Sequence, residues 1–295
     1  MTLDVSRIAT RLREGGGLTG PERQAILECR DPISLGMLAE AIRRRRHGAR
    51  VTFLRVVEVD VDAGPPDAVG GPVGEWRIVG PLTDPVAVGR VVEARARAAG
   101  STPVSGFSLS DLEAWSTAQS RPLADTLRLL GDRGLERIAE APIDLLAQPE
   151  RALEAVLEAG LATERLSVRH LVDDWHALCA RLESVRRSIG PLGRFAPLPR
   201  SPEPQTSTGY DDVRQIAWAR LLVDGVDSIQ VDWTLHGPKL AQVALAFGAD
   251  DIDAVVPETS PESPRRTLVA EIRRNVEAAS FEAVERDGRS EMVEP

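Results

Sequence analysis

The chain has 295 residues, of which 42% are hydrophobic and only 4% aromatic, so one barrel-sized domain with an aliphatic core is the natural expectation. The formal net charge of −9 argues against a nucleic-acid-binding protein, because phosphate contacts need a basic surface. No apolar run approaches the roughly 18 residues of a membrane helix, and the first residues lack the pattern of a signal peptide. We therefore expect a cytoplasmic protein that has neither a membrane nor a nucleic acid as its partner.

Residues 1–50 are predicted to form an N-terminal helical extension. Leu3–Arg13 is amphipathic, Pro21-Glu22 begins a second helix, and Pro32–His47 places apolar residues on one face of a third. Four consecutive arginines, Arg43–Arg46, end this third helix. Arginine at that position complements the helix dipole, so a solvated helix end is favoured over an anion site.

Strand and helix patterns alternate along the rest of the chain. Val51–Val57 is the first strong strand, β-branched and apolar as a buried parallel strand should be. Further strands are predicted at 76–80, 102–107, 135–138, 166–168, 194–198, 228–233 and 252–256. This alternation favours an α/β fold of the parallel (β/α) TIM-like barrel type, and it is also compatible with a partial, six-stranded open barrel. The predicted barrel spans residues 51–260, followed by C-terminal helices and a tail over 261–295.

The loop that follows the first strand, residues 58–75, was tested against two binding motifs. Its acidic alternation is typical of a calcium loop, but an EF-hand that starts at Asp60 would need Asn or Asp and then Gly at the positions of Gly64 and Pro65. The glycine-rich stretch 70–74 lacks the lysine and hydroxyl residue of a phosphate loop. The prediction is a plain, mobile loop.

Asp227–Val256 is predicted to form one strand–helix–strand unit. Period-2 alternation over Ser228–Trp233 predicts a strand, and Gly237-Pro238 predicts a helix start. Gly248 supplies the positive φ that ends a helix before a second strand, Ile252–Val256.

Polar residues gather around the ends of these late strands and on the first strand. The candidate ligand-binding residues are Arg55, Glu58, Asp232, His236, Asp251 and Asp253. Because the carboxyl ends of barrel strands form the working face, one interpretation is a pocket for a small nucleoside-like ligand. A histidine with two carboxylates could also hold a divalent metal, although no metal-spacing motif supports such a site. A third interpretation is structural, because aspartates commonly cap helices and form turns.

Three parts of the sequence resemble one known family. Gly237–Asp253 matches the pattern G-x-K-x-A-Q-x-A-L-x-F-G-A-D-D-x-D, and residues 13–54 and Ala278–Arg286 are similar to the two ends of the same family. The family is that of the menaquinone-pathway radical S-adenosylmethionine (SAM) enzymes, aminofutalosine synthase and dehypoxanthine futalosine cyclase. The resemblance covers nearly the whole chain, is weakest over Ser101–Arg194, and implies a (β/α) barrel.

The chain departs from this family after the first strand. The family carries Cys-x3-Cys-x2-Cys there, and these thiolates hold the four-iron four-sulfur cluster that binds SAM. Residues 63–76 contain no cysteine, and Cys29 and Cys179 fall on predicted helices. The family's cofactor-binding Gly-Gly is Gly80-Pro81 here. From this departure we predict no cofactor and no iron–sulfur cluster, with no metal ligands assigned.

The resemblance and the departure together predict a cluster-less relative of aminofutalosine synthase that is linked to futalosine-route menaquinone biosynthesis. We expect a non-catalytic protein, a pseudoenzyme, that binds a small nucleoside-like ligand or forms a hetero-oligomer with an active paralogue of the pathway. The alternative is a non-radical enzyme that acts at the barrel mouth on a related nucleoside or chorismate-derived compound. No Ser-His-Asp or Cys-His set or clear carboxylate pair supports that alternative, and no catalytic residue is assigned.

Overall fold

The computed structural model describes residues 4–63, 69, 71–200, 207–257 and 269–293. Ten strands form one sheet in the order β10-β1-β2-β3-β4-β6-β7-β8-β9, with β5 beside β4. The strands are β1 (Arg50–Asp60), β2 (Glu75–Val79), β3 (Val104–Ser108), β4 (Arg137–Pro142), β5 (Ala162–Thr163), β6 (Leu166–Ser167), β7 (Leu192–Ala196), β8 (Val226–Asp232), β9 (Asp251–Val255) and β10 (Glu282–Arg286).

The sheet closes on itself, because β9 pairs in parallel with β1 through Thr52 opposite Asp251. β5 and β6 both pair with β4 and are separated by only two residues, Glu164 and Arg165, so they share one strand position. The result is a closed parallel barrel of eight strand positions. This confirms the predicted TIM-like (β/α) barrel in its complete form, and the partial, open form does not apply.

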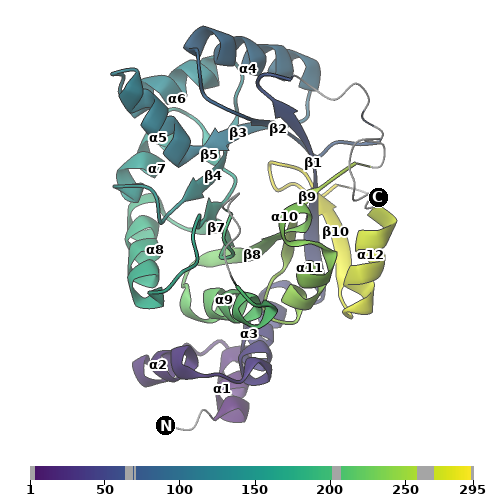
Figure 1. Cartoon of the computed structure of the whole chain (residues 1–295). Helices are drawn as coiled ribbons and strands as arrows, with labels where there is room; N and C mark the ends of the chain where they lie inside the picture. Colours follow the sequence, from purple (N-terminus) through teal and green to yellow (C-terminus); the bar gives the residue numbers. More distant parts are fainter. Residues whose placement is uncertain (1–3, 64–68, 70, 201–206, 258–268, 294–295) are drawn as a thin grey trace.

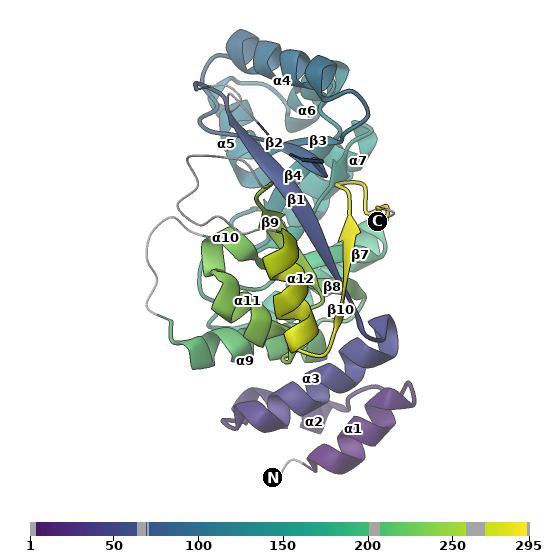
Figure 2. The ribbon, with the colours of Figure 1, turned by 90° about the vertical axis from the view of Figure 1, so that its right-hand side faces the viewer.

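Helices surround the barrel and extend it at one end (Figure 1). They are α1 (Val5–Arg13), α2 (Gly20–Glu28), α3 (Pro32–His47), α4 (Pro85–Ala99), α5 (Leu109–Ala118), α6 (Leu123–Asp132), α7 (Pro149–Glu158), α8 (Trp175–Ile189), α9 (Gly209–Leu222), α10 (Trp233–His236), α11 (Pro238–Leu245) and α12 (Val269–Ala278). Figure 2 shows α1–α3 stacked at the end of the barrel where β1 begins. In the described part of the chain, no helix is long and apolar enough to cross a membrane.

The late strand–helix–strand unit forms as predicted, with one shift at its first boundary. β8 ends at Asp232 and Trp233 already begins α10, because the Asp232 carboxylate accepts a hydrogen bond of 2.7 Å from the Leu235 N–H and caps that helix. β8 and β9 pair in parallel. Gly248, at φ +103°, lies where a Cβ atom would approach the Arg220 side chain to 2.9 Å, so glycine is needed there for both conformation and space.

Two peripheral predictions need correction. Arg43, predicted to be solvated, is fully buried: its guanidinium lies 4.1 Å from the centre of the Phe281 ring and donates to the Gly48 carbonyl at 2.9 Å. The C-terminal segment, predicted as helices and a tail, contains α12 and then the strand β10, which pairs with the first half of β1. Its boundary near residue 260 lies outside the described residues, as do 64–68 and 70 of the predicted mobile loop.

His47, the last residue of α3, ties the N-terminal helices to the barrel. Its Nε2 lies 2.8 Å from the Asp250 carboxylate and 3.1 Å from the Asp227 carbonyl. Burial opposes the charge on the ring, but the hydrogen bond and negative charge of Asp250 raise the pKa of His47 overall, even with Arg220 nearby. The protonated pair therefore stabilises the folded state.

This pair predicts a loss of stability on the alkaline side. Because the folded-state pKa of His47 is raised, its contribution is complete below the unfolded value of about 6.5 and is lost as the pH rises through the folded value. His47→Gln should remove this part of the pH dependence in urea unfolding measured between pH 5 and 9. His176→Gln, on an exposed histidine whose partner is the neutral Gln24, is the control. An unchanged pH profile in His47→Gln would contradict the assignment.

Candidate ligand-binding site

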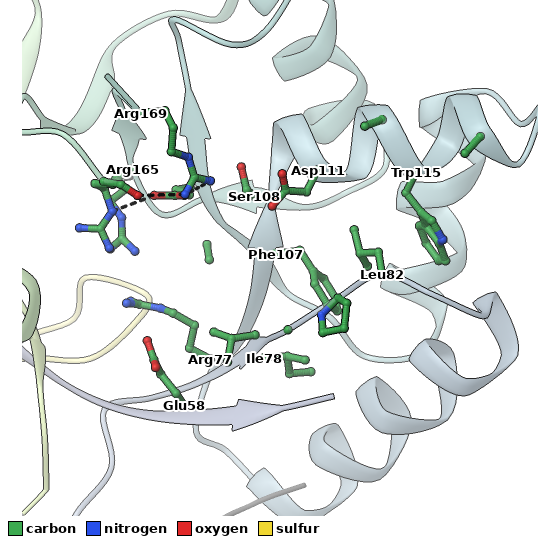
Figure 3. A pocket seen from close by; sticks show the side chains of 18 residues that line it. Glu58, Arg77, Ile78, Leu82, Phe107, Ser108, Asp111, Trp115, Arg165 and Arg169 are labelled. Carbon is green, nitrogen blue, oxygen red and sulfur yellow. Dashed lines mark hydrogen bonds and ion pairs between the residues drawn. The ribbon is translucent and has the colours of Figure 1, made fainter. Parts of the chain in front are cut away.

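A hollow of about 600 Å³ opens at the carboxyl ends of β1–β4, within the size range of small-molecule sites. Figure 3 shows its labelled arginines, Arg77, Arg165 and Arg169, facing an apolar side that includes Phe107 and Trp115. It is lined by Glu58, Arg77, Ile78, Val79, Gly80, Pro81, Leu82, Phe107, Ser108, Asp111, Ala114, Trp115, Ala118, Ala139, Glu140, Arg165, Arg169 and Arg200. We call this hollow the mouth pocket.

The apolar side of the mouth pocket comes from β3 and α5. Phe107 stands near the end of β3 with φ +62°, a conformation that costs a bulky residue about 1–3 kcal/mol and is found most often at functional sites. Trp115 is held on α5 by a hydrogen bond of 3.0 Å from its indole N–H to the Thr83 carbonyl. α5 starts at Leu109, directly after β3. Two fixed aromatic rings therefore border the hollow.

The floor of the mouth pocket is built on Asp253, which is fully buried in β9. Its two oxygens accept hydrogen bonds from Arg77 at 2.9 and 3.1 Å, and one of them also accepts from Arg165. Arg77 is held from behind by Glu75 at 2.8 Å. Burial would raise the pKa of Asp253, but the charges of Arg165 and Arg77 lower it well below the ordinary range, so the carboxylate is ionised.

A second ion-pair group closes the side of the pocket nearest β4 and β8. Arg200 donates to Glu140 at 2.8 Å and to Asp232 at 2.9 Å, and Arg169 lies 2.9 Å from the other Glu140 oxygen. Burial opposes the charge on Glu140, yet Arg200, Arg165 and Arg169 lower its pKa. Glu140 is thus an ionised carboxylate whose two oxygens are both engaged by arginine.

Asp111, at the start of α5, also lines the pocket, but its pKa is raised, whereas that of Glu140 is lowered. Asp111 is exposed at the mouth, and desolvation by the surrounding wall has the largest effect on this carboxyl group and raises its pKa. Arg169 opposes the shift, and the negative charge of Glu140 adds to it. A carboxyl group with a raised pKa that faces a pocket is a candidate acid or base.

The structure separates the six predicted ligand-binding residues into two groups. Glu58 lines the mouth pocket itself. Asp253 and Asp232 hold the arginines of its wall. His236 lies behind Asp232, whose N–H donates to its Nδ1 at 3.3 Å, and burial lowers the pKa of this imidazole. These four residues belong to one end of the barrel, and their part in binding stays a prediction.

Arg55 and Asp251 do not line the mouth pocket. Arg55 lies an odd number of residues from Thr52 and Glu58, whose side chains face the barrel interior, so it points to the other face of β1. Arg55 donates to Glu285 of β10 at 2.6 Å. Asp251 accepts two hydrogen bonds from Arg286, at 2.6 and 2.9 Å, and a third from Thr52 at 2.6 Å. Asp251 is the first residue of β9, and this position places it in the lower layer of the barrel interior, below the mouth.

Sequence reasoning missed most of the pocket wall. The residues not singled out for binding are Arg77, Phe107, Asp111, Trp115, Glu140, Arg165, Arg169 and Arg200. Arg165 and Arg169 share one segment, but Arg77 and Arg200 lie in distant segments, so no local motif signals the group. The available signal was positional: Arg77 and Glu140 interrupt segments that are otherwise largely apolar.

The described residues also test the interpretation that a histidine and two carboxylates hold a divalent metal. Among the residues for which coordinates are described, no three His, Cys, Asp or Glu side chains gather into a group that could hold a metal ion. His236, the predicted metal-type donor, instead contacts the backbone of Asp232 and the Pro199 carbonyl at 3.4 Å. The described geometry therefore adds no support to the metal interpretation.

Comparison with known proteins places the chain beside menaquinone-pathway enzymes. It is 23% identical over 218 residues to the aminodeoxyfutalosine synthase of Thermus thermophilus, covering 62% of this chain and 59% of that protein. It is 25% identical over 179 residues to the cyclic dehypoxanthine futalosine synthase of Streptomyces coelicolor, covering 52% and 45%. The chain thus spans about half the length of these relatives. No family model matches it.

A solved structure agrees over a larger part of the chain. The crystal structure of methylornithine synthase (PylB) superposes with a TM-score of 0.66 at 13% identity, covering 94% of this chain and 97% of that one. At this identity the likeness shows the shared barrel fold. Together with the two sequence relatives it confirms the predicted relationship to radical SAM proteins.

The prediction that this chain has no cofactor is wrong, because the proteins that it resembles use cofactors. The relatives, among them PylB, the hydrogenase maturase HydG and the futalosine-route synthase, are radical SAM enzymes, and these use iron–sulfur clusters and SAM. The comparison therefore gives no support to a predicted absence of cofactors.

An iron–sulfur cluster needs particular ligands from the protein. Its ligands are cysteine thiolates. Cys29 follows α2 as its C-cap, and Cys179 lies within α8, where burial raises the pKa of its thiol to about 11. The mouth pocket is instead lined by arginines, carboxylates and apolar side chains. These residues do not fit a thiolate-held cluster, and no chemical step is derived through one.

Proposed function

We propose that this chain, a relative of the menaquinone-pathway radical SAM enzymes, binds a small nucleoside-like ligand in its mouth pocket. The observation that carries the proposal is the pocket itself, about 600 Å³ in volume, with aromatic side chains on one side and ion-paired arginines on the other. Planar apolar ligands pack on aromatic walls, while a few fixed polar groups give orientation. We place the binding in the context of the futalosine route, because the sequence relatives act there.

Binding without turnover is favoured by the state of two ion-paired carboxylates around the pocket. Glu140 and Asp253 are both ionised and both engaged by two arginines. A general base must be able to take a proton, and arginines that hold the pKa of Glu140 and Asp253 down oppose this. These carboxylates therefore suit the positioning of arginines better than proton transfer.

A second candidate function is a non-radical enzyme at the same mouth. Asp111 supports it, because this carboxyl group faces the pocket and its pKa is raised. Turnover of a bound compound that stops in Asp111→Asn would favour this candidate over simple binding.

The test is a blocking substitution with a matched control. Ala114 on α5 is exposed and lines the pocket, whereas Ala94 on α4 is exposed and does not. Ala114→Trp should fill the hollow and weaken binding of adenosine or inosine at least about tenfold in calorimetry. Ala94→Trp makes the same exchange on another helix and should bind as the unchanged protein does. Equal binding by both variants would place the ligand elsewhere and refute the proposal.

The hetero-oligomer with an active paralogue of the pathway stays a separate proposal. It is supported by the match of Gly237–Asp253 to the family, since this segment includes α11 and the start of β9. On α11, the apolar side chain of Val243 is 48% exposed. Co-sedimentation of this chain with the synthase, against each protein alone, would test it.

A further inference from the structure

The segment that follows β10, Asp287–Val293, crosses the amino end of the barrel, opposite the mouth pocket. The Gly288 N–H donates at 3.0 Å to the carbonyl of Gly74, which directly precedes β2. The Ser290 hydroxyl accepts a hydrogen bond of 2.9 Å from Arg194, the third residue of β7. β2 and β7 lie on different sides of the closed sheet, so the segment spans the barrel at this end. We call this segment the plug.

Two contacts on the outer side of the plug are open to water. Arg289 pairs at 2.7 Å with Glu136, which directly precedes β4, but both side chains are 37% exposed. The Val293 N–H donates to the Glu285 carbonyl at 2.9 Å, and Val293 is itself exposed. Water screens an exposed ion pair and competes for an exposed hydrogen bond, so these two contacts contribute little to keeping the plug closed.

The closed plug also covers a carboxylate oxygen that lacks a donor. Glu75, the first residue of β2, is 0% exposed, and its Oε1 accepts from Arg77 at 2.8 Å and from Ser105 at 2.6 Å. Its Oε2 has no hydrogen-bond partner among the described residues. A Cβ atom added at Gly288 would lie 2.9 Å from this oxygen, so the backbone of the plug packs directly against it. A buried acceptor without a donor is destabilising, and water that entered beneath an open plug would supply the donor.

The backbone of the plug is strained at one residue. Ser290 has a φ of +75°, in the left-handed region that residues other than glycine rarely adopt. Asp287 holds this turn, because its carboxylate accepts hydrogen bonds of 2.8 Å from the N–H groups of Arg289 and Glu291. The strain and the unpartnered oxygen of Glu75 both raise the free energy of the closed plug, which lowers the cost of opening it.

We propose that the plug opens locally, as a hinged segment, while the barrel stays folded. Opening lets water reach the Glu75 carboxylate from the amino end. Glu75 holds Arg77, which pairs with Asp253 and lines the mouth pocket, so the plug regulates the hydration of ion pairs that support the pocket wall. The hinge lies after Arg286, whose side chain is fixed by Asp251. This inference does not depend on which ligand the pocket takes.

Hydrogen exchange of the full chain, followed by mass spectrometry at increasing urea concentration, tests the local opening. In the unchanged protein we expect the amides of the plug to exchange by a route that barely depends on urea, because local opening exposes little surface. The amides of Val51–Val57 should show the steep urea dependence of global unfolding. Adding about 0.5 M NaCl should speed the exchange of the plug by a larger factor than that of Val51–Val57, because salt screens the exposed pair of Arg289 with Glu136.

A matched pair of glycine substitutions locates the effect. Gly288→Ala places a methyl group 2.9 Å from the Glu75 carboxylate and 3.1 Å from the Pro103 Cβ, so it should displace the plug. We expect its plug amides to exchange about tenfold faster or more, as overpacking of a closed site implies, with Val51–Val57 unchanged. Gly193→Ala on β7 is the control, because an added Cβ there meets nothing within 4 Å, and it should leave the exchange of the plug unchanged.

Each other result overturns the proposal. Plug amides that share the urea dependence of Val51–Val57 would show that the plug opens only when the barrel unfolds. Plug amides that exchange as fast as those of an unstructured peptide would show that the closed plug is not populated. An equal response to Gly288→Ala and Gly193→Ala would show that packing against Glu75 does not set the opening. The urea comparison in the unchanged protein decides the matter even if Gly288→Ala fails to fold.

Discussion

Replacing Arg286 by methionine is expected to lower the free energy of unfolding by about 3–5 kcal/mol, the cost of breaking a buried ion pair on one side. Arg286 lies at the end of β10 and is 0% exposed. It donates to both Asp251 oxygens, at 2.6 and 2.9 Å, and lies 3.0 Å from Glu164. Methionine would fill part of the volume but leave both carboxylates inside the barrel with less positive charge.

Arg289 provides the control three residues later. It pairs with Glu136 at 2.7 Å in a similar forked arrangement, but both side chains are 37% exposed. Water screens such a pair, so Arg289→Met should cost less than about 1 kcal/mol. Urea unfolding of the two variants beside the unchanged protein measures the difference. If the two substitutions lower the free energy of unfolding equally, the ion pairs of Arg286 with Asp251 and Glu164 do not hold β10 to the barrel in the way we infer.

The barrel could be predicted from the sequence because its strands and helices carry local, periodic signals. Val51–Val57 and Ile252–Val256 are nearly continuous apolar runs, and Pro238 and Gly248 mark the two ends of α11. Closure was not predictable in the same way. It depends on the pairing of Thr52 with Asp251, two residues that lie far apart in the chain and carry no local sign of contact.

The interior of the barrel was predicted to be aliphatic, and its ion pairs were missed. Arg77 and Asp253 are 176 positions apart, and Arg165 and Asp253 are 88 apart. No local sequence pattern around these residues therefore identifies the partner of each. Each charged residue alone resembles a solvated position on a strand. Only the closed barrel brings these side chains to one axis and buries them.

The candidate site was predicted in part for a related reason. The aspartates at the strand ends were recognised, but which of them face the mouth depends on position within the strand. Asp253 is the third residue of β9 and supports the pocket floor, whereas Asp251 is the first and lies in the lower layer. The arginines of the pocket come from three separate segments, around Arg77, around Arg165 and Arg169, and around Arg200, and only the fold brings these segments together.

Asp253→Asn is expected to be the second costly substitution, lowering the free energy of unfolding at pH 7 by about 3–5 kcal/mol. An amide can still accept hydrogen bonds but cannot balance the charges of Arg77 and Arg165, which are 3% and 2% exposed. Asp125→Asn is the control, because Asp125 pairs with Arg128 at 3.0 Å on the surface, where both side chains are more than half exposed. That exchange should cost less than about 1 kcal/mol.

The same carboxylate predicts how the protein responds to acid. The folded-state pKa of Asp253 is lowered well below the ordinary value, because the charges of Arg165 and Arg77 outweigh the effect of burial. Its contribution is therefore complete above the unfolded value of about 4 and is lost as the pH falls toward the folded value. Urea unfolding between pH 5 and 2 should show a steep loss of stability in the unchanged protein and in Asp125→Asn. The loss should be shallower in Asp253→Asn, which has no carboxylate left to protonate at this position, and an equally steep loss in that variant would show that the floor of the pocket does not control acid unfolding.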